Sequence, residues 1–174
     1  KTGEVIAMTT SVESVFGSKV MVKGFFLNNT LTDFSLSPTR NGLPVANAPA
    51  PGKRPLSAMS PTIVFDKNGK FLLSVGSPGG PAIIDYVAET LVAMLDGGLT
   101  PAQAIALPHQ INMNGPTRME RSPLTDPLVP ALTAMGHTVT VVDGESSGLH
   151  GIEKVKGGYI GGADPRRDGV VIGD

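Results

Sequence analysis

The sequence predicts an α+β fold, in which hairpins of a mixed sheet pack against a few helices. The first observation is a pair of apolar segments, residues 62–65 and 71–75, that flank DKNGK, because Asn-Gly favours the tight turn of a hairpin. The second is a set of apolar residues that recur at helical spacing over residues 83–95. The third is the alternating segment HTVTVVD at residues 137–143, which is typical of a strand.

The N-terminal third combines short apolar segments with a long proline-rich stretch. Residues 5–8 are apolar and predict a buried strand, and residues 20–27 are rich in β-forming side chains and predict a second one. Five prolines and two glycines over residues 35–55 leave no apolar period. We therefore expect a long irregular loop there, of the kind that forms lids or walls of binding sites.

The central segment predicts two helices in succession. Gly97-Gly98 follows the long helical period and ends the first helix. Thr100 is a suitable N-cap for a short second helix over residues 102–106, and Pro101 suits its first position. The glycine pair and the Thr-Pro pair together predict that one helix ends and a second begins within a few residues.

The C-terminal segment predicts one more helix and a hairpin. Residues 108–123 are expected to be irregular or to hold one short strand. A third helix is expected to begin at Asp126-Pro127 and to end at Gly136. Residues 148–169 predict a final hairpin followed by a polar tail.

Composition excludes several classes of protein. The net charge of −1 provides no field that would attract nucleic acid or an anionic membrane, and no apolar stretch is long enough to span a bilayer. The absence of cysteine excludes disulfides and thiolate metal sites within this chain. His109, His137 and His150 lack metal-like spacing and are expected in loops or at the surface. We expect no metal, no cofactor, and neither nucleic acid nor membrane as a partner.

The turn GSPGG at residues 76–80 is the first candidate site. Glycines between a strand and a helix allow close approach of the backbone to a ligand, and the helix start adds unpaired N–H groups and a positive dipole end. Such a turn suits a phosphate or an oxygen that becomes anionic during a reaction. The Lys-Ser/Thr pair of a phosphate loop is missing, which disfavours the phosphate, and an ordinary strand–helix turn stays an alternative.

Other polar residues form weaker candidates. Glu120 and Asp126 are conceivable as a carboxylate pair for acid–base chemistry. The charged turn at residues 164–167 is expected to be solvated or ion-paired. LNNTLTDF at residues 27–34 and GKRPLSAMSPT at residues 52–62 place polar side chains beside strand-like segments, where they could form the wall of a small-ligand site.

Five segments together resemble the small subunit of γ-glutamyltranspeptidases and occur in the order found in that family. They are TSVESVFGS, GFFLNNTLTDFS, GKRPLSAMSPTIV, GSPGG and GGADPRRDG, and they span nearly the whole chain. The resemblance implies an αββα sandwich of the N-terminal nucleophile hydrolase class. It also implies a single domain over residues 1–174 that lacks its N-terminal start, with a lid-like loop at residues 35–55.

The resemblance implies an enzyme that matures by cutting its own precursor. The new N-terminal Thr of the small subunit is then the nucleophile, and its freed α-amine is the base. This Thr would lie upstream of Lys1, so the chain by itself is expected to be inactive. The implied partners are the large subunit of the same precursor, a γ-glutamyl donor such as glutathione, and an amino acid, dipeptide or water as acceptor. Family members point to the bacterial periplasm or the outside of the cell.

Three matched residues have roles in the chemical step. Gly79 and Gly80 match the pair whose N–H groups form the oxyanion hole, where one lost donor typically costs about 3–4 kcal/mol of barrier. Ser11 matches a Thr whose hydroxyl supports the nucleophile, and a serine keeps that hydroxyl. The resemblance therefore favours the oxyanion over the phosphate at the glycine turn.

Three further residues match the family's substrate contacts. Glu13 matches a position that contacts the α-amino end of the substrate, and Asp33 matches the carboxylate that pairs with the substrate ammonium. Ser57 matches the first of two adjacent serines that bind the α-carboxylate. These residues imply recognition of a glutamyl head group.

Two substitutions depart from the family pattern. Thr30 replaces the usual Gln or Glu near the α-amino group, and Ala58 replaces the second carboxylate-binding serine. A lost hydrogen bond to a charged group is worth about 1.5–3 kcal/mol, so both changes weaken head-group recognition. Two alternatives to γ-glutamyl transfer follow. One is an acylase for another amide, such as the glutaryl side chain of cephalosporins, and the other is an inactive fragment that serves as a structural partner.

Overall fold

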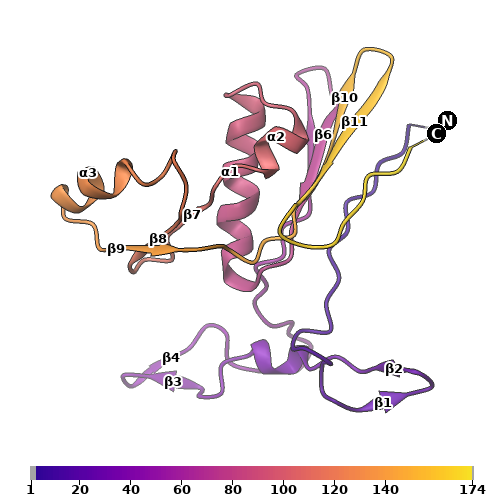
Figure 1. Ribbon diagram of the computed structural model, residues 1–174. Helices are drawn as coiled ribbons and strands as arrows, with labels where there is room; N and C mark the ends of the chain where they lie inside the picture. The colour runs from indigo at the N-terminus through magenta and orange to yellow at the C-terminus, as the bar shows by residue number, and fades with distance from the viewer. Residues whose placement is uncertain (1–2, 174) are drawn as a thin grey trace. The chain divides into compact units, whose positions relative to one another are not determined.

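The computed structural model describes residues 3–173, and the chain divides into two compact units (Figure 1). The sheet unit comprises Lys1–Thr9 with Ala58–Asp174, and the loop unit comprises Thr10–Ser57. The single domain expected over residues 1–174 therefore stays a prediction. No helix among the described residues is long and apolar enough to cross a membrane.

A four-stranded antiparallel sheet is the centre of the sheet unit, with the order β11-β10-β6-β5. Its strands are β5 (Thr62–Phe65), β6 (Phe71–Gly76), β10 (His150–Val155) and β11 (Gly158–Ala163). Both predicted hairpins are confirmed. The first turn forms because Asp66 Oδ1 accepts the N–H groups of Asn68 and Lys70, which closes the loop over Gly69.

Helices α1 (Ile83–Leu95) and α2 (Pro101–Ile105) pack against this sheet (Figure 1). The predicted caps of α2 are confirmed, since Thr100 and Gln103 form a reciprocal capping box with Pro101 at the first position. Close packing needs a glycine at position 162 on β11, where a Cβ would lie 2.5 Å from the backbone nitrogen of Ala102. The core between helices and sheet is apolar and includes Leu73, Val75, Ile83, Tyr86, Val87, Ile105, Ile111 and Leu149.

A second, three-stranded sheet has the order β7-β8-β9. Strands β7 (Gln110–Ile111) and β8 (Thr117–Glu120) are antiparallel, and β8 runs parallel to β9 (Val139–Val142). The strand expected at HTVTVVD is confirmed, whereas residues 108–123 hold two short strands. Helix α3 (Leu128–Ala134) connects β8 to β9 and begins two residues after Asp126.

The loop unit contains only short elements, and two strand predictions in the N-terminal third are wrong. Residues 20–27 form a hairpin of β1 (Met21–Val22) and β2 (Phe25–Phe26), because the chain reverses at Lys23 and Gly24 with positive φ. Residues 5–8 pair with no described strand, and Ile6 is 85% exposed. An apolar run becomes a strand only where a neighbouring strand takes up its N–H and C=O groups.

The remaining elements of the loop unit lie just before the predicted lid or within it. They are the short helix η1 (Thr30–Asp33) and strands β3 (Thr39–Arg40) and β4 (Leu43–Pro44). The proline-rich stretch is therefore irregular apart from one hairpin, in which β3 and β4 have two residues each.

Candidate active site

The turn between β6 and α1 places two glycines at the start of a helical segment. Helix η2 (Gly80–Ala82) precedes α1, with Gly79 as its N-cap. Gly79 has φ +135° and Gly80 has φ +59°, conformations that favour glycine. Among residues 3–173, no hydrogen bond uses the N–H of either glycine. Two unpaired N–H groups at a helix start are suited to an anionic oxygen.

The two glycines differ in what surrounds them. A Cβ on Gly79 would lie 2.5 Å from Cε2 and 3.1 Å from Cδ2 of the Tyr86 ring, so only glycine fits above that ring. A Cβ on Gly80 would meet nothing within 4 Å, and this residue is exposed. Gly79 is therefore held by packing on α1, and Gly80 presents the open side of the turn.

Residues 145–149, here called the backing segment, support the turn from the protein interior. The Ser77 hydroxyl donates to the Pro78 carbonyl at 2.7 Å, and the Gly148 N–H donates to Ser77 Oγ at 3.3 Å. A Cβ on Gly148 would lie 2.7 Å from Cγ of Pro78. Ser77 is only 2% exposed, so this contact orders the turn beneath its open side.

The charged turn at residues 164–167 belongs to a buried ion network. The Arg166 guanidinium donates to both carboxylate oxygens of Glu120 at 2.8 and 2.6 Å, and to Asp164 Oδ1 at 3.1 Å. It also donates to the carbonyls of Ile105 and Leu107. The prediction of an ion-paired turn is confirmed. Because Glu120 and Asp164 are 8% and 2% exposed, the network fixes the C-terminal segment in the core of the sheet unit.

The ionisation of these carboxyls follows from their partners. Burial opposes the charged form of Glu120, but the Arg166 guanidinium and the N–H groups of His109 and Glu145 outweigh it and lower the pKa of Glu120. Burial likewise opposes ionisation of Asp164, whose pKa is lowered by hydrogen bonds from Ser147 and from the N–H groups of Arg166 and Leu149. Both side chains are therefore carboxylates at neutral pH.

The carboxylate pair of Glu120 and Asp126 suggested by the sequence is not formed. Glu120 is buried and faces Arg166, whereas Asp126 is exposed and accepts the Ser122 N–H at 3.3 Å. The chain folds this way because Thr125, 2% exposed, donates its hydroxyl to the Glu120 carbonyl and turns the backbone after β8. Among the described residues, no group of three His, Asp or Glu side chains could hold a metal ion.

All three histidines lie in loops or at the surface, as expected, but His109 is buried within its loop. His137 and His150 are exposed, but His109 is 2% exposed. Its Nδ1 lies 2.9 Å from Glu89 Oε2 and its Nε2 lies 2.9 Å from Ser147 Oγ. No local pattern could reveal this, because its partners are 20 and 38 residues away in the chain.

The loop unit contains the predicted head-group residues. Ser11 Oγ accepts the Glu13 N–H at 2.7 Å, and Glu13 has a positive φ of 75°. The N–H of Thr30 donates to Asn28 Oδ1, which starts η1, and Asp33 lies half-buried at the end of that helix. Local hydrogen bonds thus set the backbone at Glu13 and Thr30.

Asn47 is a residue that the sequence analysis missed. Its side-chain amide donates to the Asp33 carbonyl at 2.6 Å, and its Oδ1 accepts the Leu56 N–H at 3.0 Å. One side chain of the predicted lid thereby joins the backbone of Asp33 to that of the residue before Ser57. The structure groups five predicted residues in the loop unit, Ser11, Glu13, Thr30, Asp33 and Ser57. Ala58, Gly79 and Gly80 belong to the sheet unit.

Comparison with known proteins identifies the family and the fold to which these residues belong. Residues 1–174 match a model of the Gamma-glutamyltranspeptidase family. The chain is 35% identical to the glutathione hydrolase proenzyme of Bacillus subtilis over 175 residues, which is 98% of this chain and 29% of that protein. The chain therefore spans less than a third of the length of this curated relative.

Solved structures give the same result. A crystal structure of a mutant γ-glutamyltranspeptidase from Helicobacter pylori matches with a TM-score of 0.84 and 31% identity, over 95% of each chain. The cephalosporin acylase from Bacillus halodurans matches with a TM-score of 0.76 and 29% identity, over 93% of this chain and 30% of that one. The α+β fold of the N-terminal nucleophile hydrolase class is thereby confirmed. The chain belongs to the γ-glutamyltranspeptidase family.

Proposed function

We propose that this chain is the catalytic small subunit of an enzyme that transfers or hydrolyses γ-glutamyl groups of glutathione-like amides. The observation that carries the proposal is the Gly79–Gly80 turn, whose two N–H groups have no hydrogen-bond partner among the described residues. The chain shares its family with glutathione hydrolases. The same turn lacks the Lys-Ser/Thr of a phosphate loop, so an oxyanion is the better occupant.

The proposed reaction has two balanced steps. The hydroxyl of the N-terminal Thr attacks the γ-carbonyl, its proton passes to the α-amine, and the tetrahedral oxyanion accepts the N–H groups of Gly79 and Gly80. Collapse expels the amine, which takes the proton, and leaves an ester on the Thr. Water or an amino group then attacks this ester through a second oxyanion at the same N–H groups, which releases glutamate or a new γ-glutamyl amide.

The head-group residues and the partner complete the proposal. Asp33 pairs with the substrate ammonium, Glu13 and Thr30 occupy the positions that contact the same α-amino end, and Ser57, followed by Ala58, binds the α-carboxylate. Ser11 supports the nucleophile. The remaining part of the precursor, the large subunit, supplies an Arg for the carboxylate.

A comparison of two donors tests the proposal on the complete, self-processed enzyme. We expect faster release of nitroaniline from a γ-glutamyl anilide than from a glutaryl anilide, because only the former has an ammonium for Asp33. Faster glutaryl turnover would instead favour the acylase alternative, to which Thr30 and Ala58 point. Turnover of neither substrate by a correctly processed protein would favour a structural role. Export to the periplasm or the medium stays a prediction that cell fractionation tests.

Asp33→Ala is expected to raise KM for the γ-glutamyl anilide by about 10–100-fold, because it removes a hydrogen bond between charged groups. The KM for the glutaryl anilide should change little, since that substrate has no ammonium. Asp96→Ala removes an exposed carboxylate just after α1 and is the matched control. Equal effects of Asp33→Ala on both donors would contradict the ammonium-pairing role.

Asn47→Asp is expected to raise KM for the γ-glutamyl donor about tenfold with a smaller change in kcat. The aspartate keeps an oxygen for the Leu56 N–H but places an acceptor against the Asp33 carbonyl, so the end of η1 moves. Asn41→Asp makes the same chemical change at an exposed turn of the same loop. Matching kinetics of the two variants would show that Asn47 does not hold the head-group residues in place.

A further inference from the structure

We propose that Tyr86 is a positioning residue for the oxyanion turn, which it supports through its ring beneath Gly79 and through its hydroxyl bond to Glu145. This inference rests on the proposed function, because it concerns how the N–H groups of that turn are aimed. Tyr86 is 1% exposed, so its side chain is buried beneath the turn and is not open to a ligand. Its effect would reach the reaction only through the backbone at Gly79.

The ring of Tyr86 is closely packed against Gly79 and against the ring of His109. Tyr86 is 1% exposed on the first turns of α1, and its Cε2 and Cδ2 atoms leave no space for a Cβ on Gly79. The ring of His109 lies against it, with centroids 4.5 Å apart and an interplanar angle of 47°. Because Gly79 rests directly on this ring, a shift of the ring moves the peptide that carries the Gly79 N–H.

The hydroxyl of Tyr86 fixes the position of the ring. It donates to Glu145 Oε2 at 2.6 Å. Glu145 also accepts from Arg118, through Nε at 2.9 Å and Nη2 at 3.1 Å, and its own N–H donates to Glu120 Oε1 at 3.2 Å. Helix α1, strand β8 and the backing segment therefore meet at this carboxylate, so the ring is anchored to elements distant in the chain.

The protonation states of Tyr86 and Glu145 favour a hydrogen bond between them at neutral pH. Burial raises the pKa of Tyr86 to about 12, and the Glu145 carboxylate adds to this effect, so the phenol keeps its proton at neutral pH. Burial opposes ionisation of Glu145, but the hydrogen bonds from Arg118 and Tyr86 outweigh it and lower the pKa of Glu145. A neutral phenol thus donates to a carboxylate, which is a strong charge-assisted hydrogen bond.

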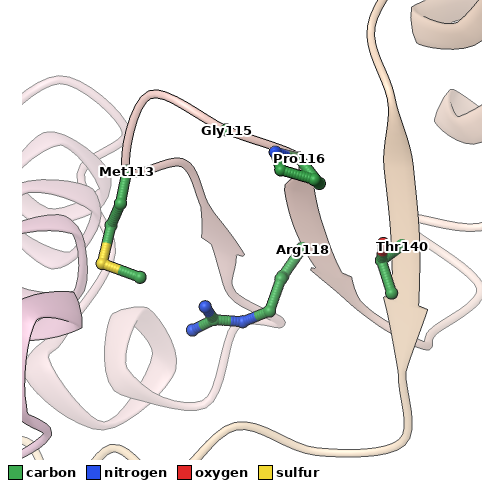
Figure 2. Close-up of a pocket in the computed structure, with 5 residues that line it drawn as sticks. All are labelled: Met113, Gly115, Pro116, Arg118 and Thr140. Carbon is green, nitrogen blue, oxygen red and sulfur yellow. The ribbon is translucent and has the colours of Figure 1, made fainter.

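The surroundings of Arg118 show how this anchor is shielded. Arg118 lines a pocket of about 370 Å³ together with Met113, Gly115, Pro116 and Thr140, and Figure 2 shows its guanidinium on the Met113 side. The side chain of Arg118 is 33% exposed, whereas that of Glu145 is 7% exposed. Water therefore reaches the arginine but scarcely reaches the carboxylate that holds Tyr86, which strengthens the bond.

Tyr86→Phe in the self-processed enzyme tests this role, because it keeps the ring and removes only the hydroxyl. Two ligands are compared. A boronic-acid analogue of the γ-glutamyl donor forms a tetrahedral anion on the nucleophile, and glutamate binds without an oxyanion. We expect kcat and the affinity for the boronate to fall about tenfold, which is less than the loss caused by removing an oxyanion-hole donor altogether. The affinity for glutamate should stay within about twofold of that of the unsubstituted enzyme.

The controls separate positioning from general damage. Tyr159→Phe removes the chain's other tyrosine hydroxyl, from an exposed ring on β11, and should change neither affinity. Glu145→Gln keeps an oxygen for the Tyr86 hydroxyl and should retain most of the boronate affinity, whereas Glu145→Leu should lose it. If Tyr86→Phe does not self-process, the comparison of Glu145→Gln with Glu145→Leu still tests whether the hydroxyl bond of Tyr86 positions the turn.

Either of two outcomes would overturn the inference. One is unchanged boronate affinity in Tyr86→Phe, and the other is an equal loss of boronate and glutamate affinity. Absence of γ-glutamyl turnover in the unsubstituted enzyme would instead overturn the proposed function. An active enzyme with an unaffected Tyr86→Phe variant would contradict the positioning role alone.

Discussion

Gly79→Ala is expected to lower kcat by about 10²–10³-fold, with little change in KM for the γ-glutamyl donor. The new Cβ would lie 2.5 Å from the Tyr86 ring, and φ of +135° is strained for alanine. Alanine keeps the N–H, so the loss would come from a displaced peptide and not from a missing donor. The measurement is steady-state release of nitroaniline by the self-processed enzyme.

The control for this substitution is Gly158→Ala at the start of β11. There a Cβ would meet nothing within 4 Å and φ is not positive, so activity and stability should stay unchanged. A Gly79→Ala variant with nearly full kcat would show that the turn does not supply an oxyanion donor through Gly79. A Gly79→Ala variant with a higher KM and an unchanged kcat would indicate that Gly79 contributes to substrate binding and not to the chemical step.

Arg166→Met is expected to lower the free energy of unfolding by about 3–5 kcal/mol, the usual cost of leaving buried charges unpaired. Methionine fills a similar volume but leaves Glu120 and Asp164 without the guanidinium that bonds both. Urea unfolding of the complete, self-processed protein measures the effect. Arg121→Met removes an exposed ion pair with Asp143 and should cost less than about 1 kcal/mol. If both variants lost a similar free energy of unfolding, burial would not be what makes the Arg166 ion pairs stabilising.

Acid unfolding provides a second measurement of the same network. The pKa values of Glu120 and Asp164 are lowered in the folded protein from ordinary values of 4.5 and 3.8. Their contribution to stability is therefore complete above those ordinary values and is lost as pH falls through the lower, folded-state values. In Arg166→Met, burial acts on Glu120 without its main counter-charge, so its pKa rises. We expect acid unfolding to begin at a higher pH in this variant.

Local patterns predicted much of the sheet unit. The Asn68-Gly69 turn, the apolar period of α1 and the Thr100-Pro101 cap depend on residues within a few positions of one another, and each element formed as expected. The two wrong strand predictions have different causes. Residues 5–8 pair with no described strand, and the sequence does not identify which strand could pair with them. Residues 20–27 form two short strands because Lys23 and Gly24 adopt a positive φ, which an apolar, β-forming pattern does not reveal.

In the candidate site, too, the sequence indicated some residues and missed others. The family segments pointed to Gly79, Gly80 and Asp33 as residue types in a recognisable order. They did not point to Asn47 or Tyr86, because an asparagine in a proline-rich loop and an aromatic residue in an apolar helix face are ordinary by pattern. Only hydrogen bonds to residues 9 to 59 positions away distinguish them.

The sequence by itself determined the family, the α+β class, the central hairpins and helices, and the glycine turn at the start of α1. These features depend on local backbone preference and on runs of matching residues, which a single chain displays directly. The tertiary structure alone decided that His109 is buried, that Arg166 joins Glu120 to Asp164, and that Tyr86 lies beneath Gly79. These features depend on which distant side chains share one low-dielectric interior, where each buried charge or polar group must find its partner.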